Sequence, residues 1–380
     1  MRVLLSTTSG AGHFRPLLPL ARALQAAGHE LACAAPAEAA AMVTREDLQH
    51  YPFDGVPPDD PDRLAVMQQL PTLTTEAAEH LMGAEVFGRL NTTFALPGAQ
   101  AAVADFRPDL VVHEAAEGSV RLAAIARGVA TLAVNPSLTI AAYVRSMAAG
   151  VTELRASLGL EPDPEGSELL TSPAVSWFPA SFDVPDAAHY DVRRYRDPDT
   201  AAPSPDGDRD LVFVTLGSEA ASTPFFAAAI TTIAAGAREA GLPVLVATGQ
   251  PVDPGPLSEI DGVRVETWVD QAEVMRRTRV VVCHAGAGTT LSALVAGVPI
   301  VAVPLFADQP YNAASIERCG VGTRVALGPS LRDDVAAATR ALAAETPAAC
   351  HDLLAEIAAL PPVTDAVPWL ASLGGRRMSG

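Results

Sequence analysis

Short apolar runs rich in β-branched residues alternate with helix-length segments through most of the chain, and this alternation is the feature that most limits the possible folds. The first forty residues predict a strand over 2–6, a glycine-containing turn, a helix over 14–27 that ends at Gly28, and a second strand over 29–35. Parallel neighbouring strands need a long crossover, usually a helix, so this order predicts a parallel βαβ unit.

The same rhythm then runs in two series, with strands predicted at 108–112, 130–134, 211–215, 243–247, 263–267, 280–283 and 299–303. Proline, glycine and charged residues dominate between the two series and indicate a linker. We therefore expect an α/β protein of two doubly wound, Rossmann-like domains that face each other across a ligand-binding cleft. The predicted parts are an N-terminal domain over 1–195, a linker over 196–210, a C-terminal domain over 211–362, and a C-terminal helix and tail over 363–380.

Charge and composition exclude several classes of function. The chain has 26 basic and 44 acidic residues and a formal net charge of −18, which argues against nucleic acid or an anionic membrane as a partner. Every basic residue is arginine, so neither a Schiff-base lysine nor a P-loop lysine is available. The chain has no long uncharged apolar run, no signal-peptide pattern and only four scattered cysteines. We therefore expect a cytoplasmic protein without a membrane span.

A histidine and a glutamate are predicted at the same edge of the first sheet. His13 stands at the start of the first helix, directly after the first strand. Glu114 lies at the carboxyl end of the strand predicted near 108–112. Because the strands are parallel, both residues are expected at the ligand-binding edge of the sheet. A carboxylate there could fix the imidazole tautomer and stabilise the imidazolium as the ring accepts a proton. A structural histidine and a solvated glutamate at a helix N-terminus are the alternatives. His113 and Glu114 lack the second histidine of a zinc-binding H-E-x-x-H helix, so no metal site is expected.

The segment V-C-H-A-G-A-G-T-T over 282–290 lies between an apolar strand and a helix predicted over 291–296. Its small residues let the backbone approach an anion, and the N–H groups of a helix start can hold a diphosphate. A tight turn alone would explain the glycines but not the histidine and the paired threonines. The residues expected at this diphosphate site are Ser218, His284, Gly286, Gly288, Thr289 and Thr290.

Two further pairs follow predicted strands. Asp308 and Gln309 place a carboxylate and an amide side by side, which suits paired sugar hydroxyls. Trp268 and Val269 end another strand, where the indole could stack on a nucleobase, although a tryptophan in such a place more often serves packing.

Taken together, these motifs resemble the GT-B glycosyltransferases, specifically the nucleotide-sugar-dependent family that includes plant secondary-product and actinomycete antibiotic glycosyltransferases. The resemblance covers essentially the whole chain. Its motifs are G-H-F-R-P-L-L-P-L-A over 12–21, W-V-D-Q over 268–271, H-A-G-A-G-T-T-L-S-A-L-V-A-G-V-P over 284–299 and D-Q-P-Y-N-A over 308–313.

The resemblance implies an inverting, metal-independent transfer of a sugar from a nucleotide-sugar co-substrate. The N-terminal domain would bind the acceptor and the C-terminal domain the donor. His13 matches the family's general base, and Glu114 stands near the place of its acidic partner. Trp268 would stack on the pyrimidine, Val269 would meet the edge of the base, and Asp308 and Gln309 would bind sugar hydroxyls.

One departure from the family pattern bears on the donor. Members that use UDP-sugars commonly carry a glutamate eight positions after the phosphate-binding histidine, and here that position is Ser292. Loss of a ribose-binding carboxylate favours a deoxyribose donor, so we expect a dTDP-sugar, and specifically a dTDP-deoxysugar, rather than a UDP-sugar. A UDP-sugar-dependent glycosyltransferase, a nucleotide-sugar epimerase of the same fold and a non-catalytic auxiliary protein are the alternatives.

The expected acceptor is a hydroxyl of a hydrophobic natural product, such as a polyketide-like antibiotic aglycone. Apolar side chains in the helical segments around 60–95 and 138–150 could line its pocket, although ordinary core packing would also place them there. The residues expected to contact the acceptor are Met67, Met82, Phe87 and Tyr143.

Overall fold

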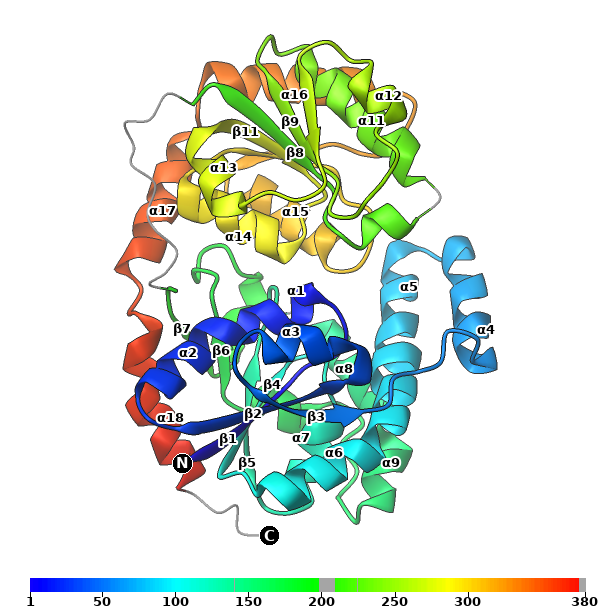
Figure 1. Ribbon diagram of the computed structural model, residues 1–380, viewed down its shortest axis with the longest axis vertical. Coiled ribbons are helices and arrows are strands. Elements are labelled where there is room, and N and C mark those ends of the chain that lie inside the picture. The colour runs from blue at the N-terminus through cyan, green and yellow to red at the C-terminus, as the bar shows by residue number, and fades with distance from the viewer. Residues whose placement is uncertain (140, 198–208, 224, 376–380) are drawn as a thin grey trace. The chain divides into compact units, whose positions relative to one another are not determined.

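The computed structural model describes residues 1–139, 141–197, 209–223 and 225–375 (Figure 1). The predicted linker over 196–210 therefore lies almost entirely outside the described residues. The chain forms two compact units, and each is made of segments that are distant in sequence. Unit 1 comprises Met1–Trp177, Pro185–Asp197 and Pro361–Gly380, and unit 2 comprises Phe178–Val184 and Pro198–Leu360.

Unit 1 is built on a seven-stranded parallel sheet with the order β3-β2-β1-β4-β5-β6-β7. The strand order reverses between β1 and β4, which is where open α/β sheets bind their ligands. The strands are β1 (Arg2–Ser6), β2 (Glu30–Pro36), β3 (Gln49–Phe53), β4 (Leu110–Glu114), β5 (Ala130–Val134), β6 (Ala174–Ser176) and β7 (Val192–Arg194).

Helices connect these strands, and two of them bury a large apolar face against the sheet. Phe106 of α6 (Thr92–Phe106) and Val120 of α7 (Ser119–Ile125) pack with Leu4 and Val111 of the strands in one buried cluster. The other helical elements of unit 1 are α1 (Ala11–Phe14), η1 (Arg15–Leu17), α2 (Leu18–Ala26), η2 (Ala37–Ala39), α3 (Ala40–Thr44), α4 (Pro61–Gln69), η3 (Leu70–Thr72), α5 (Thr75–Leu81), η4 (Met82–Asn91), α8 (Ala141–Gly150), α9 (Thr152–Ser157), α10 (Ser167–Thr171), η5 (Pro185–His189), η7 (Val363–Ala366) and α18 (Val367–Gly374).

Unit 2 has a six-stranded parallel sheet with the order β10-β9-β8-β11-β12-β13, which reverses between β8 and β11. Its strands are β8 (Leu211–Thr215), β9 (Val244–Ala247), β10 (Val263–Glu266), β11 (Thr278–Cys283), β12 (Ile300–Ala302) and β13 (Gly322–Arg324). Its helices are η6 (Ala220–Ser222), α11 (Phe226–Arg238), α12 (Gly255–Ser258), α13 (Gln271–Arg277), α14 (Ala287–Ala296), α15 (Gln309–Arg318), α16 (Leu331–Ala344) and α17 (Ala348–Ala359). The prediction of two doubly wound parallel sheets is confirmed.

Three predicted helical segments differ in extent from the structure. The helix predicted over 14–27 is divided into α1, η1 and α2 and begins at Ala11. The helix predicted over 291–296 begins at Ala287, four residues earlier, because the glycines and threonines of this segment already adopt helical geometry. The helical segment predicted around 138–150 is helix α8, and a second helix, α9, follows it after Val151.

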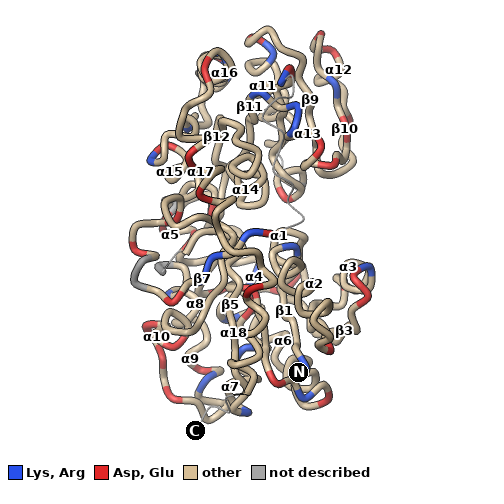
Figure 2. The backbone as a smooth tube through the Cα atoms, turned by 90° about the vertical axis from the view of Figure 1, so that its left-hand side faces the viewer, with Lys and Arg blue, Asp and Glu red and all other residues tan. Residues whose placement is uncertain are grey.

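Arginines are interspersed with acidic residues along the described chain, so the arginines form no continuous basic stretch (Figure 2). In the part of the chain that the structure describes, no helix is both long enough and apolar enough to cross a membrane.

Candidate active site

The structure brings His13 and Glu114 together at the point where the unit 1 sheet reverses its strand order. His13 lies in the short helix α1, which begins after Gly10, a residue with φ of 98°. Glu114 is the last residue of β4 and is completely buried. The Nδ1 atom of His13 lies 3.1 Å from Oε1 of Glu114.

Two further donors fix the Glu114 carboxylate. The hydroxyl of Thr8 donates to Oε1 at 3.2 Å, and the backbone N–H of Ala116 donates to Oε2 at 2.8 Å. A buried carboxylate held in this way favours the His13 tautomer that carries its proton on Nδ1. Nε2 is then the ring nitrogen with a lone pair for a proton from a bound molecule.

An aromatic group extends from His13. The ring of Phe87, in η4, has its centroid 6.0 Å from that of His13, and the ring of Tyr143, in α8, lies 5.9 Å from Phe87 in an edge-on arrangement. Of the predicted acceptor residues, Phe87 and Tyr143 are therefore close to the histidine. Met67 lies half-buried on α4, and Met82 is the half-buried first residue of η4.

Glycines allow η4 and α8 to approach closely enough to form this aromatic group. η4 is a π-type helix, a form often found at functional sites. A Cβ on Gly83 would lie 2.9 Å from Cβ of Ser146, and a Cβ on Gly88 would lie 2.7 Å from the Met147 carbonyl. A Cβ on Gly150 would lie only 2.0 Å from the Ala84 carbonyl. These contacts fix the backbones that carry Phe87 and Tyr143.

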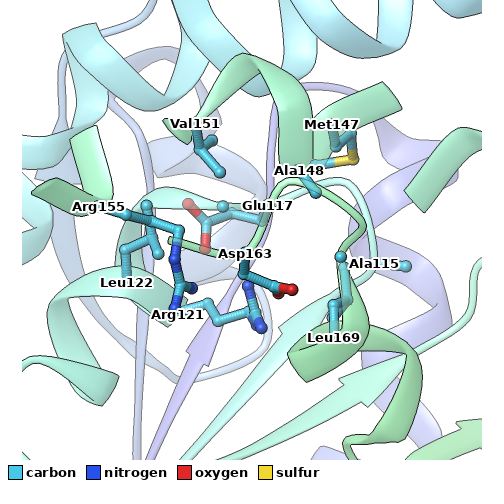
Figure 3. Close-up of a pocket in the computed structure, with 12 residues that line it drawn as sticks. Ala115, Glu117, Arg121, Leu122, Met147, Ala148, Val151, Arg155, Asp163 and Leu169 are labelled. Carbon is cyan, nitrogen blue, oxygen red and sulfur yellow. The ribbon is translucent and has the colours of Figure 1, made fainter. Parts of the chain in front are cut away.

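A small pocket adjoins the turn that follows Glu114, and sequence analysis did not predict it (Figure 3). Buried Arg121 and Arg155 each donate to one oxygen of Glu168, at 2.9 Å. The buried Glu117 carboxylate accepts from the backbone N–H groups of Ser119 and Val120 at the start of α7. Burial raises the pKa of Glu117 and lowers the pKa of Arg121. An arginine inside the apolar segment S-V-R-L-A-A-I was the available sequence signal.

In unit 2, His284 is held tightly between two glycines. It follows β11, and a Cβ on Gly217 or on Gly286 would lie 2.8 or 2.3 Å from its Nε2 atom. We call these two residues the glycine cradle. Burial lowers the pKa of His284 to about 4, although nearby Asp308 and a hydrogen bond with the Thr215 backbone act in the opposite direction. At neutral pH the ring is uncharged and can donate one hydrogen bond.

Helix α14 begins directly after Gly286, which is both part of the glycine cradle and the N-cap of the helix. A helix start leaves backbone N–H groups without intrahelical partners, and a Cβ on Gly288 would have no neighbour within 4 Å. Thr289 accepts a hydrogen bond from Gln271 at 3.0 Å. Thr290 is fully buried, and its hydroxyl has no partner among the described residues.

The other predicted donor residues occupy neighbouring loops of unit 2. The side-chain amide oxygen of Gln309, Oε1, accepts hydrogen bonds from the backbone N–H groups of Leu305 and Phe306. The NH₂ group of the same amide is therefore the part suited to a ligand. Asp308 accepts from Asn312, a residue whose role the sequence analysis missed although it lies within the D-Q-P-Y-N-A motif. Ser218 follows β8, and its hydroxyl lies 3.4 Å from the Glu219 carboxylate.

Trp268 is 58% exposed, which is unusual for so large an apolar side chain and suits stacking on a planar ring. Val269 beside it is half-buried. Ser292, in the second turn of α14, donates to the Gly288 carbonyl at 2.9 Å.

Comparisons with known proteins give the family. Residues 200–347 match the family model described as UDP-glucoronosyl and UDP-glucosyl transferase. The chain is similar to the L-demethylnoviosyl transferase of Streptomyces niveus, with 30% identity over 88% of this chain and 87% of the relative. It is also similar to the oleandomycin glycosyltransferase of Streptomyces antibioticus, with 27% identity over 85% of this chain and 78% of the relative.

Solved structures share the fold. A glycosyltransferase from Streptomyces sp. SF2575, solved in complex with thymidine diphosphate, is 24% identical, with a TM-score of 0.74 over 98% of this chain and 99% of that one. The calicheamicin glycosyltransferase CalG4 is 21% identical, with a TM-score of 0.78 over 99% of this chain and 98% of that one. The chain therefore belongs to the GT-B, nucleotide-sugar-dependent glycosyltransferases that include the antibiotic glycosyltransferases of Streptomyces, and it is an enzyme that transfers sugars.

Proposed function

We propose that this glycosyltransferase moves a sugar, and specifically a deoxysugar, from a dTDP donor to a hydroxyl of a hydrophobic natural product, with inversion at the anomeric carbon. The observation that carries the proposal is the His13–Glu114 pair, in which a buried carboxylate lies 3.1 Å from a partly exposed imidazole. Such a pair suits a general base that deprotonates a hydroxyl.

The reaction is a direct displacement. Nε2 of His13 takes the proton of the acceptor hydroxyl as its oxygen bonds to the anomeric carbon, and the bond from that carbon to the diphosphate oxygen breaks on the opposite face. Glu114 stabilises the imidazolium that forms. The leaving diphosphate needs stabilisation of its charge, which the N-terminus of α14 and the Thr289 hydroxyl would supply. His284, uncharged and hydrogen-bonded to the Thr215 backbone, would pack beside the diphosphate without adding charge. No step in this sequence uses a metal ion.

Three observations favour a thymidine diphosphate donor. Ser292 stands where UDP-sugar-dependent members commonly have glutamate, and its hydroxyl is engaged by the Gly288 carbonyl. The Streptomyces sp. SF2575 enzyme, which shares the fold, was solved with thymidine diphosphate. The glycosyltransferase VinC, also similar in fold, was solved with dTDP.

The acceptor proposal rests on Phe87, whose ring lies next to His13, and on Tyr143, whose ring packs edge-on against Phe87. The similarity to an oleandomycin glycosyltransferase supports transfer onto an antibiotic. A UDP-sugar donor is the second candidate, because the family model that matches residues 200–347 is that of UDP-glucoronosyl and UDP-glucosyl transferases.

The test is sugar transfer from a dTDP-deoxysugar to a panel of aromatic and macrocyclic alcohols, followed by mass spectrometry. The wild type should form a glycoside, and His13→Ala should form it about 10²–10⁴ times more slowly, the usual contribution of a general base. His351→Ala, at an exposed histidine of α17, is the matched control and should keep the wild-type rate. Isomerised donor without glycoside would indicate an epimerase, and no change of the donor with any acceptor would indicate an auxiliary protein.

A further inference from the structure

Asn312 joins two loops of unit 2 that carry the proposed donor-binding residues. It lies in α15 and is completely buried. Its Nδ2 atom donates to the Ala285 carbonyl at 2.9 Å and to Oδ2 of Asp308 at 2.8 Å. One side-chain amide group therefore donates hydrogen bonds to two loops, the loop that follows β11 and the loop that follows β12.

Both loops contain an alanine in the left-handed region of backbone space. Ala285 has φ of 62° and Ala307 has φ of 56°. For a residue with a Cβ this conformation costs roughly 1–2 kcal/mol, so surrounding contacts must maintain it. The Asn312 bond to the Ala285 carbonyl acts directly on one of these strained residues.

The position of Ala285 makes this bond consequential. Ala285 is buried and lies between His284 and Gly286, the N-cap of α14. Its backbone conformation therefore sets both the direction in which His284 enters the glycine cradle and the orientation of the first N–H groups of the helix. At the other end of the bridge, the Asn312 amide fixes one oxygen of Asp308, the carboxylate proposed to bind sugar hydroxyls.

We propose that Asn312 is a positioning residue that holds both the diphosphate-binding loop and the sugar-binding carboxylate in place. This inference rests on the proposed function, because it assigns a role within the proposed donor site. Asn312 is fully buried and acts through Ala285 and Asp308. Its loss should therefore weaken binding of the nucleotide diphosphate itself as well as recognition of the sugar.

A comparison of two variants separates the effect of Asn312 on the diphosphate-binding loop from its effect on Asp308. Asp308→Ala removes the sugar-binding carboxylate and leaves the Asn312–Ala285 bond in place, so its affinity for TDP should stay within about twofold of the wild type. Asn312→Ala removes the bond to the diphosphate-binding loop, so its affinity for TDP should fall about tenfold, the effect of one lost hydrogen bond between uncharged groups. In the double variant, the loss for TDP should equal that of Asn312→Ala alone.

Calorimetric titration of the full chain with TDP and UDP gives these affinities, and thermal unfolding without nucleotide shows whether each variant is folded. If Asn312→Ala does not fold, Asn312→Leu, which keeps the size of the side chain but has no donor, takes its place with the same expectation of weakened TDP binding. Wild-type affinity for TDP in the folded Asn312 variant would overturn the inference alone. Failure of the wild type to bind TDP or UDP would overturn the proposed function and this inference with it.

Discussion

The Nδ1 atom of His13 lies 3.1 Å from Oε1 of Glu114, and the two side chains differ sharply in exposure, since 31% of His13 but none of Glu114 is accessible. A buried carboxylate that faces a partly exposed imidazole can stabilise the protonated ring while it stays inaccessible to solvent. Thr8 and Ala116 hold the carboxylate in place, so it does not need the histidine for its orientation.

Removal of the Glu114 charge should slow the transfer step. Glu114→Gln keeps the size of the side chain but no longer stabilises an imidazolium, so kcat should fall about 10–100-fold, and the affinity for TDP should not change because the proposed donor site lies in unit 2. Steady-state kinetics with saturating donor measure the effect. Glu46→Gln, which removes one side of an exposed ion pair with Arg22, is the control. Unchanged kcat in Glu114→Gln would show that the carboxylate does not serve the base.

Substitution by alanine should destabilise unit 2 at Gly286, which belongs to the glycine cradle, but not at nearby Gly288. Gly286→Ala would place a Cβ 2.3 Å from Nε2 of His284, so the ring must move, and both the stability of unit 2 and the affinity for TDP should fall. Gly288→Ala meets no atom within 4 Å and should leave stability within about 1 kcal/mol of the wild type.

Urea unfolding and titration with TDP measure both properties. If Gly288→Ala weakens TDP binding without loss of stability, the diphosphate lies against Gly288. Equal stability of Gly286→Ala and the wild type would contradict the tight packing of His284.

The buried histidine predicts a pH dependence of stability. Burial lowers the pKa of His284 to about 4, whereas an unfolded histidine titrates near 6.5. Between these values the unfolded state binds more protons, so the free energy of unfolding falls as the pH decreases from about 6.5 to about 4. From pH 7.5 to pH 5 the loss should be about 2 kcal/mol for this residue.

Urea unfolding at both pH values checks the sign and the size of this effect. His284→Asn should show a smaller loss between pH 7.5 and pH 5, and exposed His351→Asn, also in unit 2, should behave as the wild type does. His113 in unit 1 is also buried, with a pKa lowered to about 4, but Glu117 in the same unit has a raised pKa and acts in the opposite direction. An identical pH dependence in His284→Asn and the wild type would refute the prediction.

The aromatic group next to His13 should govern the acceptor and leave the donor unaffected. Phe87→Ala removes the ring that lies between His13 and Tyr143, so the KM for an apolar acceptor should rise about tenfold while the affinity for TDP stays the same. Leu64→Ala, at an exposed leucine of α4, is the control. A rise in the KM of the donor instead of the acceptor would assign Phe87 a different role.

Sequence patterns predicted the central strands well, because β-branched runs such as β1, β5 and β8 are bounded by turn residues. They missed β3, which carries Pro52 and polar residues at the edge of the sheet, where proline is tolerated. They also missed three strands of only three residues each, β6, β7 and β13, which are too short for a periodic signal.

Within the site, residue types and spacing predicted the side chains that follow central strands, such as His13, Glu114 and His284. They could not predict Asn312, whose partners lie four and 27 positions away, because a buried amide between two loops leaves no local pattern. The glycine cradle has the same limitation, since the Gly217 and Gly286 contacts depend on how β8 and β11 pair.

Unit 2 is proposed to hold a nucleoside diphosphate with a preference for thymidine, and thermal unfolding with saturating nucleotide tests this proposal. A ligand at 100 times its dissociation constant adds about 2.7 kcal/mol to the free energy of unfolding, enough for a clear shift of the midpoint. We expect a larger shift with TDP than with UDP at equal concentration. A larger shift with UDP would contradict the assignment of the donor, and no shift with either nucleotide would contradict the diphosphate site at His284 and the start of α14.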